Sequence, residues 1–225
     1  MSGFFSSSIG RKIVMALSAI FLMLFLLLHV TINFISVVSE DLFNQLSHFM
    51  GTNLIIQFLM QPILIAGVVV HFVLGFVLEA KNRSSRAVSY AQYNGGENSS
   101  WMSRNMIYSG LVILAFLGLH FADFWIPEIN VKYIQGDMSG MHNGEFRYWA
   151  ELNHKFEPAW RTIAYVVSFI LLSLHLLHGF TSSLQSMGVT AKGKKVYGTI
   201  GKIYAIVIPV LFIIVAIYHH FNQIH

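Results

Sequence analysis

The stretch Leu171–Gly188, LLSLHLLHGFTSSLQSMG, decides how the chain folds, because it is an apolar run of helix length with two histidines in its middle. The two histidines are His175 and His178. An imidazole inside an apolar segment long enough to cross a membrane is costly unless something binds it, so it indicates a functional site. Three further apolar stretches carry one such histidine each: His29, His71 and His120. We therefore expect these four segments to organise the molecule.

The composition is typical of a membrane protein. Of the 225 residues, 55% are hydrophobic and only 11% are charged, whereas soluble domains carry about 25% charged residues. The net charge of +4 does not indicate nucleic-acid binding, because the basic residues lie in short loops between apolar runs. The chain has no cysteine, which excludes disulfides, thiolate ligation of haem, covalent c-type haem and iron–sulfur ligation by cysteine.

We predict one all-α membrane domain over residues 1–225, built as a bundle of five transmembrane helices. A helix needs about 20 apolar residues to cross the hydrocarbon core, and a lipid-exposed strand would leave its backbone unsatisfied. The five stretches run approximately over residues 13–38, 54–78, 106–126, 162–184 and 200–221. The first is too long for a signal-peptide core and has no small-residue cleavage site after it, so we expect a retained helix.

The basic residues predict the orientation. Ten of the fourteen lie before the first helix, between the second and third, or between the fourth and fifth, and this side should be cytoplasmic. The N-terminus is then inside and the C-terminus outside. The longest outer segment is the connection between the third and fourth helices, at roughly residues 127–160.

The direction of each helix places the histidines at two depths. His29 and His120 lie past the middle of outward-running helices, and His71 and His175 or His178 lie past the middle of inward-running ones. At 1.5 Å per residue the two levels are on the order of 13 Å apart. Depth alone slightly favours His178 over His175 as the partner of His71.

Two opposed imidazoles from two helices are what a b-type haem requires, so two levels predict two haem b groups across the bilayer. Zinc is a rival, but it would gather four ligands at one level. A proton relay is another, but relays include carboxylates at depth, and the helix interiors hold almost none. The remaining histidines lie in loops or near the C-terminus, and we expect them to be interfacial rather than ligands.

At this point the sequence resembles the cytochrome b558-type membrane subunit of succinate dehydrogenase and fumarate reductase, the single-chain di-haem type. The similarity covers nearly the whole chain. It is carried by the order and spacing of short motifs: Ser8–Leu17, then His29 and Asn33; His71 and Gly75, then Asn82-Arg83, Ala87 and Tyr90; Ser103-Arg104-Asn105-Met106, then Ser109-Gly110 and His120; and His175-x-x-His178-Gly179, then Gln185 and Gly188.

The resemblance implies a partner assembly and a role. A flavoprotein with covalent FAD and an iron–sulfur subunit would bind on the cytoplasmic side of a bacterial inner membrane. This subunit would relay electrons to a quinone, which is menaquinone in the family members it most resembles, without touching succinate. The quinone site would lie near the outer haem. The implied iron ligands are His29 with His120 for the outer haem, and His71 with His175 for the inner haem. The family frame thus selects His175, with His178 as a neighbour of the haem.

Further residues are candidates for contacts with the haems or with the quinone. The resemblance suggests Tyr165 near the outer haem, although a packing role is the alternative. Ser103, Arg104 and Gln185 cluster at the inner helix ends and are candidate contacts of the inner haem. For the quinone we consider Asp123, whose carboxylate could exchange the quinone's protons. The other quinone-site candidates are three amides near the outer end of the second helix: Asn44, Asn53 and Gln57.

Two other classes of function remain open from the sequence. The chain is alternatively a di-haem b subunit of another respiratory complex, such as a hydrogenase or a formate dehydrogenase, or a haem-free scaffold or transporter. The direction of turnover, the oligomeric state of the complex and any coupling to proton movement also stay open.

Overall fold

The computed structural model describes residues 7–84, 106–142, 144–189 and 191–223, and in these ranges the chain is almost entirely helical. Five helices of 26–31 residues are long and apolar enough to cross a membrane. They match the five stretches predicted from the sequence, so the all-α, multi-pass membrane class is confirmed. The helices run longer than predicted at most of their ends, because apolar periodicity marks the lipid-facing part of a helix and not its last turns.

The structure has these elements in chain order: α1 (Ser8–Val38), α2 (Glu40–Thr52), the π-turn η2 (Ile56–Met60), α3 (Gln61–Ser84), α6 (Met106–His120), the π-turn η3 (Phe121–Trp125), α7 (Ile126–Ile129), the π-turn η4 (Asn130–Ile134), β1 (Met141–His142), β2 (Glu145–Phe146), α8 (Tyr148–Lys155), α9 (Ala159–Ser186) and α10 (Ala191–Phe221).

Small polar residues end and begin the helices at the membrane boundary. The Ser7 side chain accepts a hydrogen bond from the backbone N–H of Gly10 at the start of α1. Ser39 ends α1 and also caps α2, where its Oγ accepts from Leu42 N at 3.3 Å. The acidic residues that follow Ser39 favour the positive end of α2. One serine therefore marks the point where the chain leaves the first membrane span.

The third span ends later than predicted. The sequence prediction ended it at Ile126 because Pro127 follows, whereas the helix continues to Ile134 through η3, α7 and η4. The π-turn explains the difference. Ile126 donates its N–H to Phe121 O, five residues back, and Pro127 then falls in the first turn of α7, where a missing N–H costs little.

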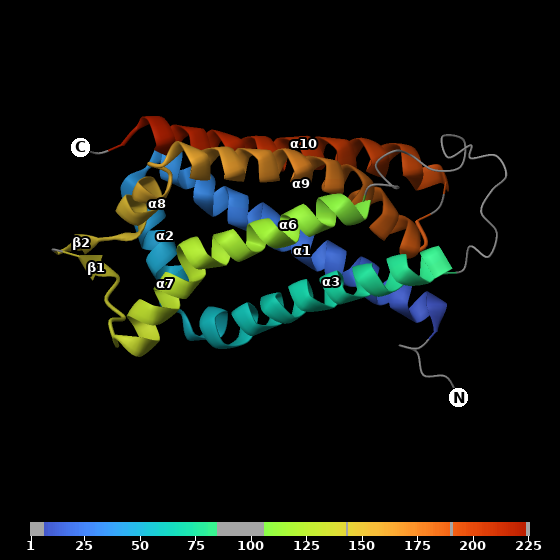
Figure 1. Cartoon of the computed structure of the whole chain (residues 1–225), viewed down its shortest axis with the longest axis horizontal. Coiled ribbons are helices and arrows are strands. Elements are labelled where there is room, and N and C mark those ends of the chain that lie inside the picture. Colours follow the sequence, from blue (N-terminus) through green and yellow to red (C-terminus); the bar gives the residue numbers. More distant parts are fainter. Residues whose placement is uncertain (1–6, 85–105, 143, 190, 224–225) are drawn as a thin grey trace.

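The helices form one elongated bundle (Figure 1). α9 packs along α10 and also against α1 and α6, whereas α3 lies at the periphery and packs mainly on α1. The α1–α3 contact is close, because a Cβ atom on Gly67 would lie 3.0 Å from the Phe21 ring. The Ser8 end of α1 and the Phe221 end of α10 lie at opposite ends of the bundle, as an odd number of crossings requires.

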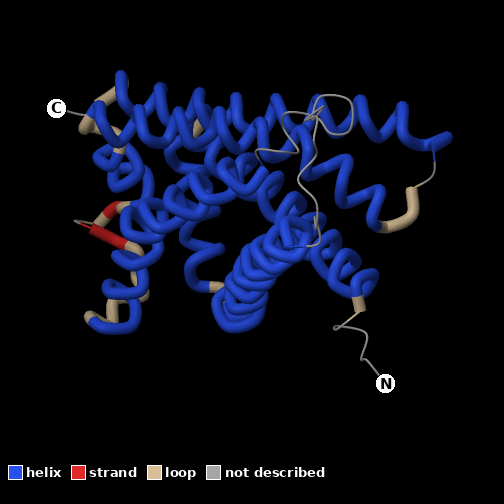
Figure 2. Tube along the Cα trace, turned by 45° about the vertical axis from the view of Figure 1, so that its right-hand side comes forward, coloured by secondary structure: helices blue, strands red, loops and turns tan. Residues whose placement is uncertain are grey.

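A compact cap covers the end of the bundle where α10 finishes. It consists of α2, the β1–β2 hairpin and α8 (Figure 2). Trp149 of α8 fastens the cap to the first helices: its backbone N–H donates to Asn44 Oδ1 at 2.8 Å, and its indole Nε1–H donates to Ser36 O at 2.8 Å. All three of these side chains are buried. The cap is therefore part of the folded core rather than a loose external loop.

A buried ion network holds the extended third span against the cap. Lys132 is 2% exposed, and its ammonium group contacts the Glu128 carboxylate at 2.6 Å and the backbone carbonyl of Gly51. The second Glu128 oxygen contacts Arg147, which also pairs with Glu151. Burial alone would lower the pKa of Arg147, but its hydrogen bonds to Glu151 and Glu128 raise that pKa above its ordinary value. The guanidinium therefore stays charged between the two acids.

Candidate functional site

The structure brings His29 and His120 together at the cap end of the bundle. His29 comes from α1 and His120 is the last residue of α6, and their ring centroids are 5.7 Å apart with an interplanar angle of 87°. We call them the outer pair, after the side predicted for them. His29 stacks on Phe25 and His120 on Phe116, so each ring has an aromatic neighbour on its own helix.

A second pair lies at another level of the bundle and joins α3 to α9. His71 of α3 and His175 of α9 have ring centroids 6.4 Å apart, with an interplanar angle of 67°. We call them the inner pair. Among the described residues, His175 and not His178 makes the ring contact with His71. The ring that faces His71 is therefore that of His175, the residue selected by the family resemblance, and not that of His178, which depth alone slightly favoured.

The centroid distances suit a metal ion between each pair of rings. Two imidazoles that bind one metal from opposite sides have centroids about 6.3 Å apart, because metal–nitrogen bonds are about 2.0–2.1 Å and the ring centre lies roughly 1.1 Å behind each nitrogen. Both pairs lie close to that distance. Within the described residues, no three His, Asp or Glu side chains gather at one point. A metal held at either pair would therefore take its remaining ligands from outside this set of side chains.

Two serines contact the inner pair in the same way. Ser18 Oγ lies 3.2 Å from His71 Nδ1, and Ser109 Oγ lies 3.2 Å from His175 Nδ1. Sequence reasoning missed Ser18 altogether and used Ser109 only as part of a motif. A signal was present, however: a serine stands eleven residues before His29 in the first helix and eleven residues before His120 in the third.

These contacts also measure the distance between the two levels. On α1, Ser18 lies at the level of the inner pair and His29 belongs to the outer pair, and on α6, Ser109 and His120 have the same relation. Eleven residues of helix span about 16 Å. This value is somewhat larger than the separation expected from the sequence, and both helices give it independently.

His219 is a purely structural histidine and differs from the inner pair in its hydrogen bonds. It is completely buried, and both of its ring nitrogens have protein partners: Nε2 lies 2.8 Å from Ser36 Oγ, and Nδ1 lies 3.3 Å from Asn153 Nδ2. It joins α10 to α1 and α8. By contrast, each inner histidine is hydrogen-bonded to a described residue at Nδ1 only, which leaves its Nε2 for another partner.

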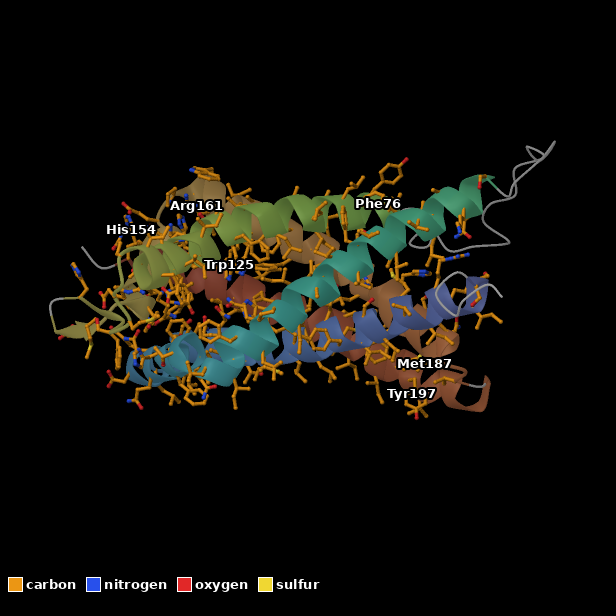
Figure 3. The ribbon with its side chains drawn as sticks, turned by 90° about the horizontal axis from the view of Figure 1, so that it is seen from below. Phe76, Trp125, His154, Arg161, Met187 and Tyr197 are labelled. Carbon is orange, nitrogen blue, oxygen red and sulfur yellow. The ribbon has the colours of Figure 1, made fainter. Side chains whose placement is uncertain are left out.

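A buried polar cluster adjoins the outer pair. Asp123 lies in η3, three residues after His120, and is 5% exposed. Tyr165 of α9 donates its hydroxyl hydrogen to Asp123 Oδ2 at 3.0 Å, and Arg161 Nε lies 3.3 Å from Asp123 Oδ1. The Tyr165 ring is 6.3 Å from the His120 ring. Figure 3 shows Arg161 near the cap end of the bundle, opposite Met187 and Tyr197. Arg161 is one of the four basic residues that the sequence analysis left outside the cytoplasmic set, and its contact with Asp123 was not predicted.

The three amides considered for the quinone site have other partners. Asn44 Oδ1 accepts from Trp149 N, and Asn53 Oδ1 accepts from Ile55 N at 3.0 Å and Ile56 N at 3.2 Å. Gln57 donates from Nε2 to Met50 O at 2.8 Å. These bonds hold the cap and the connection into α3. Of the four residues considered for the quinone, only Asp123 contacts described residues around the outer histidines.

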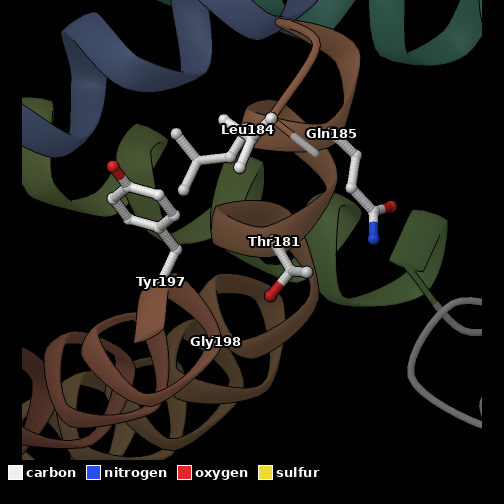
Figure 4. A pocket seen from close by; sticks show the side chains of 6 residues that line it. Thr181, Leu184, Gln185, Tyr197 and Gly198 are labelled. Atoms are coloured by element: carbon white, nitrogen blue, oxygen red, sulfur yellow. The ribbon is translucent and has the colours of Figure 1, made fainter. Parts of the chain in front are cut away.

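The candidates at the inner end are only partly placed. Ser103 and Arg104 lie outside the described residues. Gln185 is exposed near the end of α9 and lines a small, mostly apolar pocket with Tyr197 and Gly198 of α10 (Figure 4). No histidine lines this pocket. His178 is partly buried, one helical turn from His175.

Comparison with protein-family models, with curated proteins and with solved structures found no match. The functional interpretation therefore depends on the geometry of the site and on the motifs in the sequence.

The two histidines of α9 should have different effects on cofactor content. If the chain binds the two haems expected from the sequence, His175→Ala should lose the inner one, because its ring faces His71, and His178→Ala should keep both. Haem per chain, measured by pyridine haemochrome after purification in detergent, checks this. Loss of a haem in His178→Ala with both retained in His175→Ala would reverse the assignment.

Proposed function

We propose that this chain is the di-haem cytochrome b membrane-anchor subunit of a succinate:quinone oxidoreductase, relaying electrons between an iron–sulfur subunit and a membrane quinone. One observation carries the proposal: four helices each contribute one histidine, and the four rings form two facing pairs at two levels of the bundle. Haem b at each pair would supply reversible one-electron redox chemistry.

The residues of this chain have distinct tasks in this proposal. His29 and His120 would hold the outer iron, and His71 and His175 the inner iron. Phe25, Phe212 and Phe124 lie with ring centroids 5.2–5.7 Å from the outer histidines and keep water from them. A low-dielectric surrounding of this kind is one of the factors that set a haem potential.

The Asp123–Arg161–Tyr165 cluster supports a quinone site near the outer pair. Reduction of a quinone to a quinol requires two protons together with two electrons. Arg161 Nε lies 3.3 Å from Asp123 Oδ1, and the Tyr165 hydroxyl donates to Asp123 Oδ2. A carboxylate held in this way beside the outer histidines is suited to accept or deliver a proton at a bound quinone. Asp123 is therefore our first candidate among the four residues considered from sequence.

The partners follow from orientation. The basic inner loops predict that the ends of α3 and α9 and the start of α10 face the cytoplasm of a bacterial inner membrane. A flavoprotein with FAD and an iron–sulfur subunit would dock there, on the side of the inner pair. The capped end would face outward. This order places an inner haem between the iron–sulfur subunit and the outer, quinone-side haem.

The rival functions predict different experimental results. A di-haem subunit of a hydrogenase or formate dehydrogenase would purify with other partner subunits, and the neighbouring genes would differ accordingly. The motifs around Ser103–Met106 and His175–Gly179 favour the succinate dehydrogenase or fumarate reductase assembly. A haem-free scaffold or transporter would show no b-type spectrum at all.

A reduced-minus-oxidised spectrum tests the proposed function directly. We expect a b-type alpha band from membranes that contain the chain, and two haems per chain by pyridine haemochrome, because there are two facing pairs. One haem per chain would mean that one pair has another role. Absence of the alpha band from purified, intact protein would remove the haem proposal.

Asp123→Asn tests the proton role of the cluster. The amide keeps the shape of the side chain but cannot accept a proton, so quinone-linked turnover in the assembled complex should fall on the order of 100-fold. Haem content should stay at two, because Asp123 is not a ligand. Asp41→Asn, at an exposed acid of the cap, is the matched control. Unchanged quinone turnover in Asp123→Asn would remove Asp123 from the site.

The absence of cysteine gives a clean test of orientation. We expect His142→Cys, in the exposed hairpin of the cap, to react with a membrane-impermeant maleimide in intact cells. Met187→Cys, which is 44% exposed at the opposite end of the bundle, should react only after the membrane is opened. The inverse pattern would place the cap in the cytoplasm and contradict the proposed docking side.

A further inference from the structure

The hydroxyl hydrogens of Ser18 and Ser109 are already committed. Ser18 Oγ donates to Met15 O at 2.8 Å, and Ser109 Oγ donates to Met106 O at 2.9 Å. Each oxygen is then left as an acceptor toward the nearby imidazole. When each hydroxyl donates to its helix carbonyl, the ring nitrogen 3.2 Å from its oxygen supplies the hydrogen of that contact. In this arrangement His71 and His175 both carry their hydrogen on Nδ1.

This tautomer leaves the Nε2 lone pair of each inner histidine without a hydrogen. Nε2 is then the nitrogen that can bind a metal, and a histidine ligand whose other N–H is held by an acceptor is fixed in orientation and is more basic. The serine thus favours Nε2 as the nitrogen that is available to a metal.

The outer pair lacks an equivalent device among the described residues. His120 Nδ1 is buried and has no hydrogen-bond partner there, and neither ring nitrogen of His29 is hydrogen-bonded to a described residue. The two pairs therefore differ in what lies behind the ligand, although both have similar ring separations.

We propose that Ser18 and Ser109 are matched positioning residues that hold His71 and His175 in the Nδ1–H tautomer and make the inner pair the more electron-donating of the two. This inference rests on the proposed haem-binding function. Their matching geometry supports a shared role: each sits on an outward helix, bonds to the carbonyl three residues back, and lies eleven residues before an outer histidine.

The two serines should also affect the redox potential of the inner haem. An imidazole that donates its Nδ1 hydrogen to an acceptor gives more electron density to the metal and favours the ferric state. Loss of the acceptor should therefore raise the midpoint potential of the inner haem. The outer haem should keep its potential, because its histidines do not contact these serines.

The test is redox potentiometry of purified, haem-loaded protein, followed optically and by EPR. The inner haem is identified as the signal that His71→Ala loses. Ser18→Ala and Ser109→Ala should each raise the potential of this signal alone and shift its EPR g values, and the double variant should shift it further. Ser18→Thr and Ser109→Thr keep a hydroxyl and should restore the wild-type values.

Ser168→Ala is the control, because Ser168 is also buried and bonds to the carbonyl of Ala164 within its own helix. It should leave both potentials unchanged. If an alanine variant loses the inner haem, the threonine variant at the same position is compared with it. Retention of the inner haem in the threonine variant supports the role of the hydroxyl group. Loss of the inner haem in both variants overturns that role. Equal shifts at both haems, or no shift, also overturn it. A wild-type chain without haem would instead overturn the proposed function.

Discussion

The structure depends on one constraint, the cost of placing imidazole nitrogens in hydrocarbon. A histidine ring has two polar nitrogens, and each needs a partner where water is absent. His219 meets this need wholly within the protein, through Ser36 and Asn153. The inner histidines meet only half of it, through a serine at Nδ1. The half that stays unmet is what distinguishes a binding site from a packed core in this chain.

The way these needs are met gives the bundle an approximate internal symmetry. α1 carries a serine for α3, and α6 carries a serine for α9, while α1 and α6 face each other through His29 and His120. Two helical hairpins therefore contribute equivalent parts to both levels. α10 stands outside this scheme: it packs along α9 and closes the cap through His219.

Much of the fold was predictable because lipid imposes simple rules. Apolar length gave the five spans, and alternating direction gave the two depths of the histidines. The serine contacts were missed, because a hydroxyl such as that of Ser18 can bond within its own helix and so needs no partner on another one. The matched spacing of Ser18 and Ser109 before the outer histidines was the one signal in the sequence. The extension beyond Ile126 was also missed: Pro127 is a correct stop signal for an α-helix, but a π-turn changes the bonding just before it. The cap was missed because it depends on distant partners such as Asn44 and Trp149.

The order in which these contacts join the chain has a consequence for biogenesis. A membrane chain emerges from the ribosome with its N-terminus first. The outer pair becomes possible once α6 has been made, the inner pair only after α9, and the His219 contacts only after nearly the whole of α10. The bundle is therefore completed from the outer histidines inward and is locked last by a residue close to its end. A chain truncated within the fifth span would hold all four facing histidines but lack the contacts of His219 with Ser36 and Asn153.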